Sequence, residues 1–106
     1  MESSIVCEYK DKGNVVYIIC EILDESVYDK IKEGQIVLIC LNSKKNLEFM
    51  LQNWQKFIVN PKLKTIFSNP EVNLQWSLVP YTHNKYSDPA SLKTGIKSIA
   101  ENVPLV

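Results

Sequence analysis

Gln35-Ile36-Val37-Leu38-Ile39-Cys40-Leu41 is apolar from its second residue to its last, and Gly34 and Asn42 flank it. Successive side chains of a strand point to opposite faces of a sheet, so this run is apolar on both faces. That pattern is typical of a central strand covered by helices on both sides. The sequence therefore predicts an α/β domain built around residues 35–41.

The chain before this run predicts a hairpin. Residues 4–9 and 15–23 are rich in strand-forming side chains, and Gly13 and Asn14 between them favour a turn. Because the turn is short, we expect the two strands to pair with each other.

A short helix is expected between this hairpin and the central strand. Asp24 can cap a helix over residues 25–33, and Gly34 stands where a glycine commonly ends one. A strand, a helix and a strand in this order form a βαβ unit, so the strands on either side of the helix should be parallel.

The strongest helical pattern follows the central strand. Asn42 or Ser43 can cap a helix that runs from Lys44 to about Val59, and Asn60-Pro61 ends it. Its apolar side chains recur at the three- and four-residue spacing of one helix face. They are Leu47, Met50, Leu51, Trp54, Phe57 and Ile58.

The last third of the chain predicts a second hairpin and a third helix. Residues 63–67 and 74–78 should pair as antiparallel strands at one edge of the sheet. Residues 81–86 are predicted as a polar, aromatic loop. A final helix then begins at Asp88-Pro89 and is stopped by Pro104.

The expected order is ββαβαββα, with three helices and a small mixed sheet of four or five strands in one α/β domain, residues 1–106. Without the first strand this is the order of thioredoxin-like domains and of some three-layer α/β sandwiches, which is an analogy of topology alone. Thioredoxin-like redox chemistry needs a reactive cysteine where the first core strand meets its helix. The chain has Asp24 at that junction, so such catalysis is not expected.

Composition bears on the partners that the protein can have. The net charge is zero and every basic residue except His83 is a lysine. Arginine supplies the planar fork that recognises guanine and phosphate, so its absence disfavours a nucleic-acid partner. No apolar run approaches the ~20 residues that span a bilayer, and the polar start does not resemble a signal peptide. We expect a cytoplasmic protein without a membrane partner.

The three cysteines, Cys7, Cys20 and Cys40, are expected to be reduced. Their number is odd and their spacing is wide, whereas a disulfide scaffold or a zinc site needs more or closely paired cysteines. No metal site is therefore predicted.

No cofactor is expected, because the chain contains neither a Gly-x-Gly-x-x-Gly nor a Walker A motif. One candidate anion site remains, made by Asn42, Ser43, Lys44 and Lys45. These residues lead from the carboxyl end of the central strand into a helix N-terminus, where backbone N–H groups favour an anion. The alternative interpretation is a capped helix with a solvated first turn.

A second candidate site is the segment Tyr81, Thr82, His83, Asn84, Lys85 and Tyr86. His83 is the single histidine, which excludes a metal site of several histidines but allows a general base assisted by a neighbour such as Asp88. The alternative is an ordinary loop whose tyrosines pack on the sheet edge. The expected strand directions put this segment and the anion site at opposite edges, so the two should not form one site.

The sequence carries no recognised family motif. The function it favours is a non-catalytic binding or protein-interaction module, with a homodimer through a sheet edge or a helix as one form. The alternative is a small enzyme or small-ligand-binding protein that uses the Tyr81–Tyr86 segment around His83.

Overall fold

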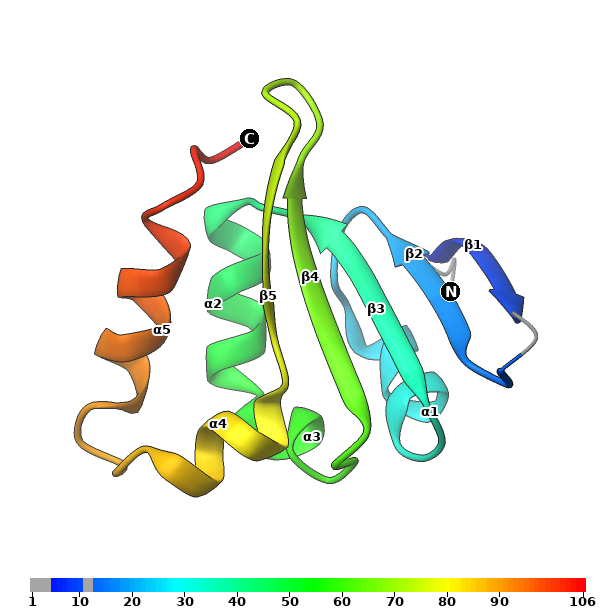
Figure 1. Ribbon diagram of the computed structural model, residues 1–106, viewed down its shortest axis with the longest axis horizontal. Coiled ribbons are helices and arrows are strands. Elements are labelled where there is room, and N and C mark those ends of the chain that lie inside the picture. The colour runs from blue at the N-terminus through cyan, green and yellow to red at the C-terminus, as the bar shows by residue number, and fades with distance from the viewer. Residues whose placement is uncertain (1–4, 11–12) are drawn as a thin grey trace.

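The computed structural model describes residues 5–10 and 13–106 (Figure 1). In chain order its elements are β1 (Ile5–Lys10), β2 (Val16–Cys20), the 3₁₀ helix η1 (Glu25–Val27), α1 (Tyr28–Ile31), β3 (Ile36–Leu41), α2 (Lys44–Gln52), α3 (Trp54–Phe57), β4 (Leu63–Asn69), β5 (Leu74–Leu78), α4 (Pro80–Tyr86) and α5 (Leu92–Ala100). No helix in the described part of the chain is both long enough and apolar enough to span a bilayer.

The five strands form one mixed sheet in the order β1-β2-β3-β4-β5. The outer pairs, β1 with β2 and β4 with β5, are antiparallel, and β3 lies parallel to both of its neighbours. The predicted mixed sheet, its central strand and its two hairpins are therefore confirmed.

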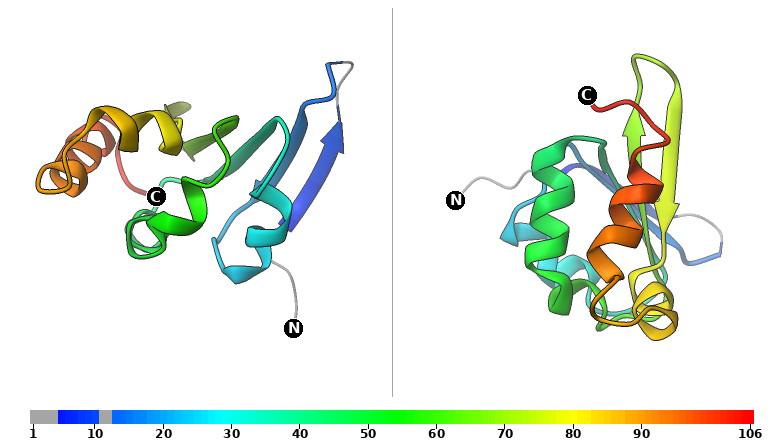
Figure 2. Two further views of the ribbon diagram at one scale, coloured as in Figure 1. Left: turned by 90° about the horizontal axis from the view of Figure 1, so that it is seen from below. Right: turned by 90° about the vertical axis from the view of Figure 1, so that its left-hand side faces the viewer.

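The prediction that helices cover both faces of the sheet is wrong. Figure 2 shows α1, α2 and α3 on one face, α5 beside them beyond β5, and α4 at the end of β5. The strand order explains this arrangement. The crossovers from β2 to β3 and from β3 to β4 step across the sheet in the same direction, and crossovers of one hand then place their helices on the same side. The domain therefore has two layers, one sheet and one helix layer, rather than three.

The predicted number of helices is also wrong, because the expected helix over residues 44–59 is two helices. At Asn53 the backbone leaves helical geometry, with φ −114° and ψ 30°, and α2 ends there before α3 begins. The Asn53 backbone N–H and side-chain nitrogen both donate to the Phe49 carbonyl oxygen, over 3.1 and 2.9 Å, at the end of α2.

The expected loop over residues 81–86 is the helix α4. Pro80 occupies its first turn, where a missing N–H costs nothing and a fixed φ suits a helix. The His83 N–H donates to the Val79 carbonyl over 3.0 Å and closes the first turn. The last helix also begins later than expected, at Leu92, after a turn in which the Asp88 carboxylate accepts from the Ser91 N–H over 3.0 Å.

The core lies between the sheet and its helix layer. Phe57 of α3 and Phe67 of β4 are fully buried there, and Phe67 stacks on Trp76 of β5 with ring centroids 4.4 Å apart. Every fully or nearly buried strand side chain from Ile18 to Leu78 alternates with a more exposed one. The core therefore uses one face of each strand.

Buried asparagines form hydrogen bonds with backbone groups close to the ends of the strands. The Asn46 side-chain oxygen accepts from the Leu23 N–H over 2.8 Å, and its nitrogen donates to the carbonyls of Glu21 and Leu41 over 2.8 and 2.9 Å. Asn60 donates to the carbonyls of Ile31 and Gly34 over 2.9 Å each. These contacts satisfy backbone groups that loops would otherwise bury unpaired.

Candidate functional site

The sheet face opposite α1, α2 and α3 is apolar, and of the described helices only α4 approaches it, at the end of the sheet where Thr82 lies near Val37 and Lys64 (Figure 2). We call it the open face. Its apolar side chains come from the strands β1 to β4, and all are half-buried except the exposed Tyr9. They are Tyr9, Tyr17, Ile19, Val37, Ile39, Leu41 and Ile66.

Strand register arranges these side chains in rows across the sheet. Ile19 pairs with Ile39, Ile39 pairs with Ile66, and Ile66 pairs with Ser77, which gives a row of three isoleucines centred on β3. One pleat away, Tyr17 pairs with Val37, and Val37 pairs with Lys64. The open face is thus apolar in its middle and polar toward β5.

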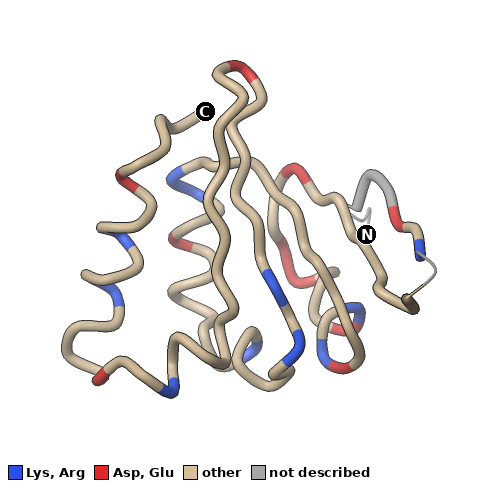
Figure 3. The backbone as a smooth tube through the Cα atoms, viewed as in Figure 1, with Lys and Arg blue, Asp and Glu red and all other residues tan. Residues whose placement is uncertain are grey.

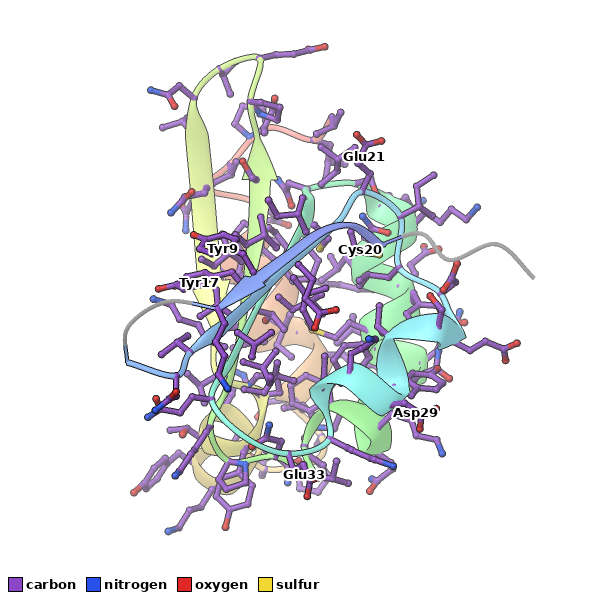
Figure 4. The ribbon with its side chains drawn as sticks, turned by 90° about the vertical axis from the view of Figure 1, so that its right-hand side faces the viewer. Tyr9, Tyr17, Cys20, Glu21, Asp29 and Glu33 are labelled. Atoms are coloured by element: carbon purple, nitrogen blue, oxygen red, sulfur yellow. The ribbon has the colours of Figure 1, made fainter. Side chains whose placement is uncertain are left out.

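A pair of stacked tyrosines lies at the β1–β2 side of the open face. Tyr9 of β1 and Tyr17 of β2 face each other across the hairpin, with centroids 4.9 Å apart and planes 9° apart. Figure 4 shows the two rings beside each other on the side of the sheet away from α2, whereas Cys20 lies toward the helices. Stacked tyrosines present a broad, rigid apolar surface with polar tips, which suits protein binding.

A shallow hollow of about 190 Å³ indents the open face near the carboxyl end of β3. Ile19, Ile39 and Leu41 form its apolar floor, and Glu21 and Ser68 border it. A second hollow of about 460 Å³ lies near the other end of β3, where Val37 and Lys64 meet Val79 and Thr82. The open face therefore offers relief into which protruding apolar side chains can fit.

Charge is divided across the molecule (Figure 3). Among the described residues, 5–33 carry mainly carboxylates and 62–100 carry mainly lysines. The acidic side chains of the first group are Glu8, Glu21, Asp24, Glu25, Asp29 and Glu33, and the lysines of the second are Lys62, Lys64, Lys85, Lys93 and Lys97. Most of these charges lie away from the open face: Glu8, for example, pairs with Lys30 of α1 over 3.3 Å, whereas Lys64 is on the open face beside Val37.

His83 lies on α4 beside the helix α3. Its ring packs edge-on against the Trp54 ring, with the two centroids 6.4 Å apart. Its Nε2 atom is buried without a hydrogen-bond partner among the described residues. The neighbouring Asn84 accepts from the Trp54 indole N–H over 3.0 Å. A hollow of about 430 Å³ between α4, β5 and α5 is lined in part by Thr82, His83 and Tyr86.

The other members of that segment are mostly in solvent. Tyr81 and Tyr86 are exposed, Tyr86 to 78%, and the Lys85 Nζ atom lies over the Tyr86 ring, 5.8 Å from its centroid. Tyr86 nevertheless lines a hollow together with Ser77 and Leu78 of the edge strand β5. Of the six candidate residues, the hollow brings together only Thr82, His83 and Tyr86.

The side chains of the first two residues of the candidate anion site form hydrogen bonds within the protein. Asn42 is fully buried and its amide nitrogen donates to the carbonyls of Val103 and Pro104 over 3.1 Å each. The Ser43 hydroxyl caps α2 by accepting from the Asn46 N–H over 3.1 Å. Lys44 and Lys45 are exposed.

The two candidate segments lie at opposite ends of the sheet. Asn42 follows the carboxyl end of β3, whereas α4 follows β5, which runs antiparallel to β4 and therefore against β3. Figure 1 shows α4 at the end of the sheet farthest from the start of α2. The two segments cannot share one ligand.

The two thiols with described side chains are poorly placed for nucleophilic chemistry. Burial, reinforced by the nearby Asp24 carboxylate and opposed by a hydrogen bond to Ile22, raises the pKa of Cys20 to about 11. Burial also raises the pKa of Cys40, and neighbouring Cys20 adds to this shift. Both are free thiols. Within the described residues, no three His, Cys, Asp or Glu side chains gather closely enough to hold a metal ion.

Sequence reasoning did not single out the open face. Its signal was present, because Ile19, Ile39 and Ile66 occupy the strand positions that alternate with the core residues. Comparison with known proteins finds no matching family model, no similar curated protein and no similar solved structure.

Proposed function

We propose that this protein is a non-catalytic protein-interaction module that binds a protein partner through the open face. The observation that carries the proposal is the uncovered row Ile19, Ile39 and Ile66 with the aromatic pair beside it. Parallel strands are rarely left uncovered on one face, because water then contacts a large apolar surface. Exposed apolar patches of several hundred Å² commonly mark binding sites for proteins.

The distribution of polar groups supports binding rather than catalysis. Catalysis by side chains needs an acid, base or nucleophile that converges with a partner group on one position. Here the Cys20 and Cys40 thiols are buried, and Asn42 is committed to structural hydrogen bonds. We place the module in the cytoplasm, in keeping with its free thiols.

Site-specific photocrosslinking tests the proposal. A photoreactive phenylalanine analogue replaces Ile39 at the centre of the open face, and the same analogue replaces Gln52 on the exposed side of α2 as the control. We expect protein adducts from position 39 under illumination in cells and few from position 52. Equal yields from the two positions, or none from position 39, would overturn the proposal.

A second candidate function is small-ligand binding at His83. The observation that favours it is the buried, unpartnered Nε2 atom beside the hollow that His83 lines. A ligand that supplied a hydrogen-bond partner to Nε2 would stabilise the protein. Native mass spectrometry of gently purified protein tests this idea, since retained small-molecule mass that His83→Phe abolishes would support it. A bare chain under the same conditions would speak against it.

A further inference from the structure

We infer that the partner of the open face is a second copy of this chain, packed face to face about a two-fold axis that runs along β3. This inference rests on the proposed function, because it names the occupant of the same surface. Three properties of the open face support it: its width, the symmetry of its isoleucine row about β3, and the pairing of Tyr17 with Lys64 that this axis gives.

The width of the open face favours a sheet as its occupant. Five strands at about 4.8 Å spacing make a surface roughly 24 Å across. A single helix is about 10 Å wide with its side chains and would leave more than half of that surface in water. A second sheet of the same size covers it completely, at the ~10 Å spacing of packed sheets.

One row of side chains on the open face is symmetric about β3. A two-fold axis along β3 exchanges the β2 side with the β4 side and keeps each row at its own height. Ile39 then meets Ile39 of the second copy, and Ile19 meets Ile66. In the adjacent row Tyr17 meets Lys64, a pairing in which an ammonium group can lie over an aromatic ring.

The pairing of Tyr17 with Lys64 favours this axis over the other one that sheets packed face to face can adopt. An axis perpendicular to the strands would place β2 over β2 and would not bring the Lys64 ammonium group over the Tyr17 ring.

The size of the open face sets the strength of the dimer. A sheet roughly 24 Å wide with strands about 20 Å long buries on the order of 1,000 Å² in total when two copies meet. That area is near the lower limit for a specific interface. We therefore expect a reversible dimer with a dissociation constant in the micromolar range.

Sedimentation equilibrium over about 1–300 µM protein tests for the dimer. We expect the native chain to dimerise across this range and Ile39→Lys to weaken the dimer at least 100-fold, because two lysines would meet on the axis. Gln52→Lys, which adds the same charge on exposed α2, should leave the dimer unchanged. A native chain that stays monomeric at the highest concentration overturns the inference.

Chemical crosslinking tests the axis without depending on Ile39→Lys folding correctly. In a Cys7→Ser background, one chain carries Ile19→Cys and a second, of different mass, carries Ile66→Cys. After mixing, a short bismaleimide should join the two different chains far more often than it joins two Ile19→Cys chains. A preference for Ile19→Cys pairs overturns the axis along β3.

The photocrosslinking experiment separates this inference from the proposed function. An adduct at position 39 with the mass of two chains supports both. An adduct with another protein, in a chain that sediments as a monomer, supports the interaction module and overturns the second copy as its partner. No adduct at position 39 overturns both.

Discussion

The Trp76 indole N–H donates to the side-chain oxygen of Asn42 over 2.9 Å. This buried hydrogen bond links β5 to the residue that follows β3. The same asparagine donates to the carbonyls of Val103 and Pro104, and its own carbonyl accepts from the Val106 N–H over 2.9 Å. Asn42 therefore holds the C-terminal segment against the carboxyl ends of the strands.

Asn42→Ala should destabilise the protein by about 3 kcal/mol, because the buried Trp76 indole N–H and the Val103 carbonyl both lose this side chain as a partner, whereas the Pro104 carbonyl keeps its bond from Asn69. Urea denaturation measures the free energy of unfolding. Asn102→Ala removes an exposed asparagine with a single 3.4 Å contact and serves as the control, with an expected change below about 0.5 kcal/mol. A loss at Asn42 as small as that control would contradict the structural role assigned to it.

Gly95→Ala should stabilise the protein by about 0.5–1 kcal/mol, because alanine is the better helix former at an unstrained position. A Cβ atom at Gly95 would lie 3.8 Å from the His83 Nε2 atom, an ordinary contact. Gly34→Ala is the matched control. Gly34 has φ +90°, so alanine should be strained there and should destabilise the protein by more than about 1 kcal/mol.

Thermal and urea unfolding of both glycine variants checks this pair of predictions. A destabilising Gly95→Ala would show that α5 and His83 approach more closely than the structure has them. A neutral Gly34→Ala would show that the turn after α1 can adopt another backbone conformation.

The Tyr9–Tyr17 stack should contribute a coupling free energy of about 0.5–1.5 kcal/mol. A double-mutant cycle with Tyr9→Leu and Tyr17→Leu measures it, at protein concentrations that keep the chain monomeric. The cycle of Tyr9→Leu with Ile66→Leu is the control, because β1 and β4 are not neighbours in the sheet. Equal coupling in the two cycles would mean that the rings gain nothing from their 4.9 Å stacking.

The sheet could be predicted from the sequence because strand side chains repeat with a period of two and the turns carry glycine or asparagine. The uncovered face could not. Ile19, Ile39 and Ile66 are apolar whether a helix or another molecule covers them, so alternation alone does not reveal what lies above a strand. That answer depends on the strand order β2-β3-β4, which the sequence does not display.

The wrong helix predictions have local causes in the sequence. The apolar spacing of residues 44–59 continues through Asn53 without interruption, so the pattern gives no sign of the break between α2 and α3. Helix α4 consists largely of residues with weak helix propensity, and it forms because Pro80 starts it and Trp54 packs against it. For the candidate segments, the sequence drew attention to Asn42 and His83 but did not show their long-range contacts with Trp76 and Trp54.

Stability should fall as pH rises from about 9 toward 11, and Cys20 should account for part of the loss. The unfolded thiol ionises near pH 8.5–9, whereas desolvation and the Asp24 carboxylate hold the folded pKa at about 11, against a smaller opposing effect of the Ile22 hydrogen bond. The unfolded state therefore binds fewer protons in this window, and linkage makes the free energy of unfolding decrease with pH.

Cys20→Ser keeps a donor for the Ile22 carbonyl but does not titrate, so its curve of unfolding free energy against pH should be flatter between pH 9 and 11. Cys40→Ser should flatten the curve as well, because burial raises that pKa too. Ser98→Ala on the exposed side of α5 is the control and should keep the native slope. Urea denaturation at a series of pH values measures all four slopes, and a Cys20→Ser curve parallel to that of the native chain would show that the folded thiol ionises as easily as the unfolded one.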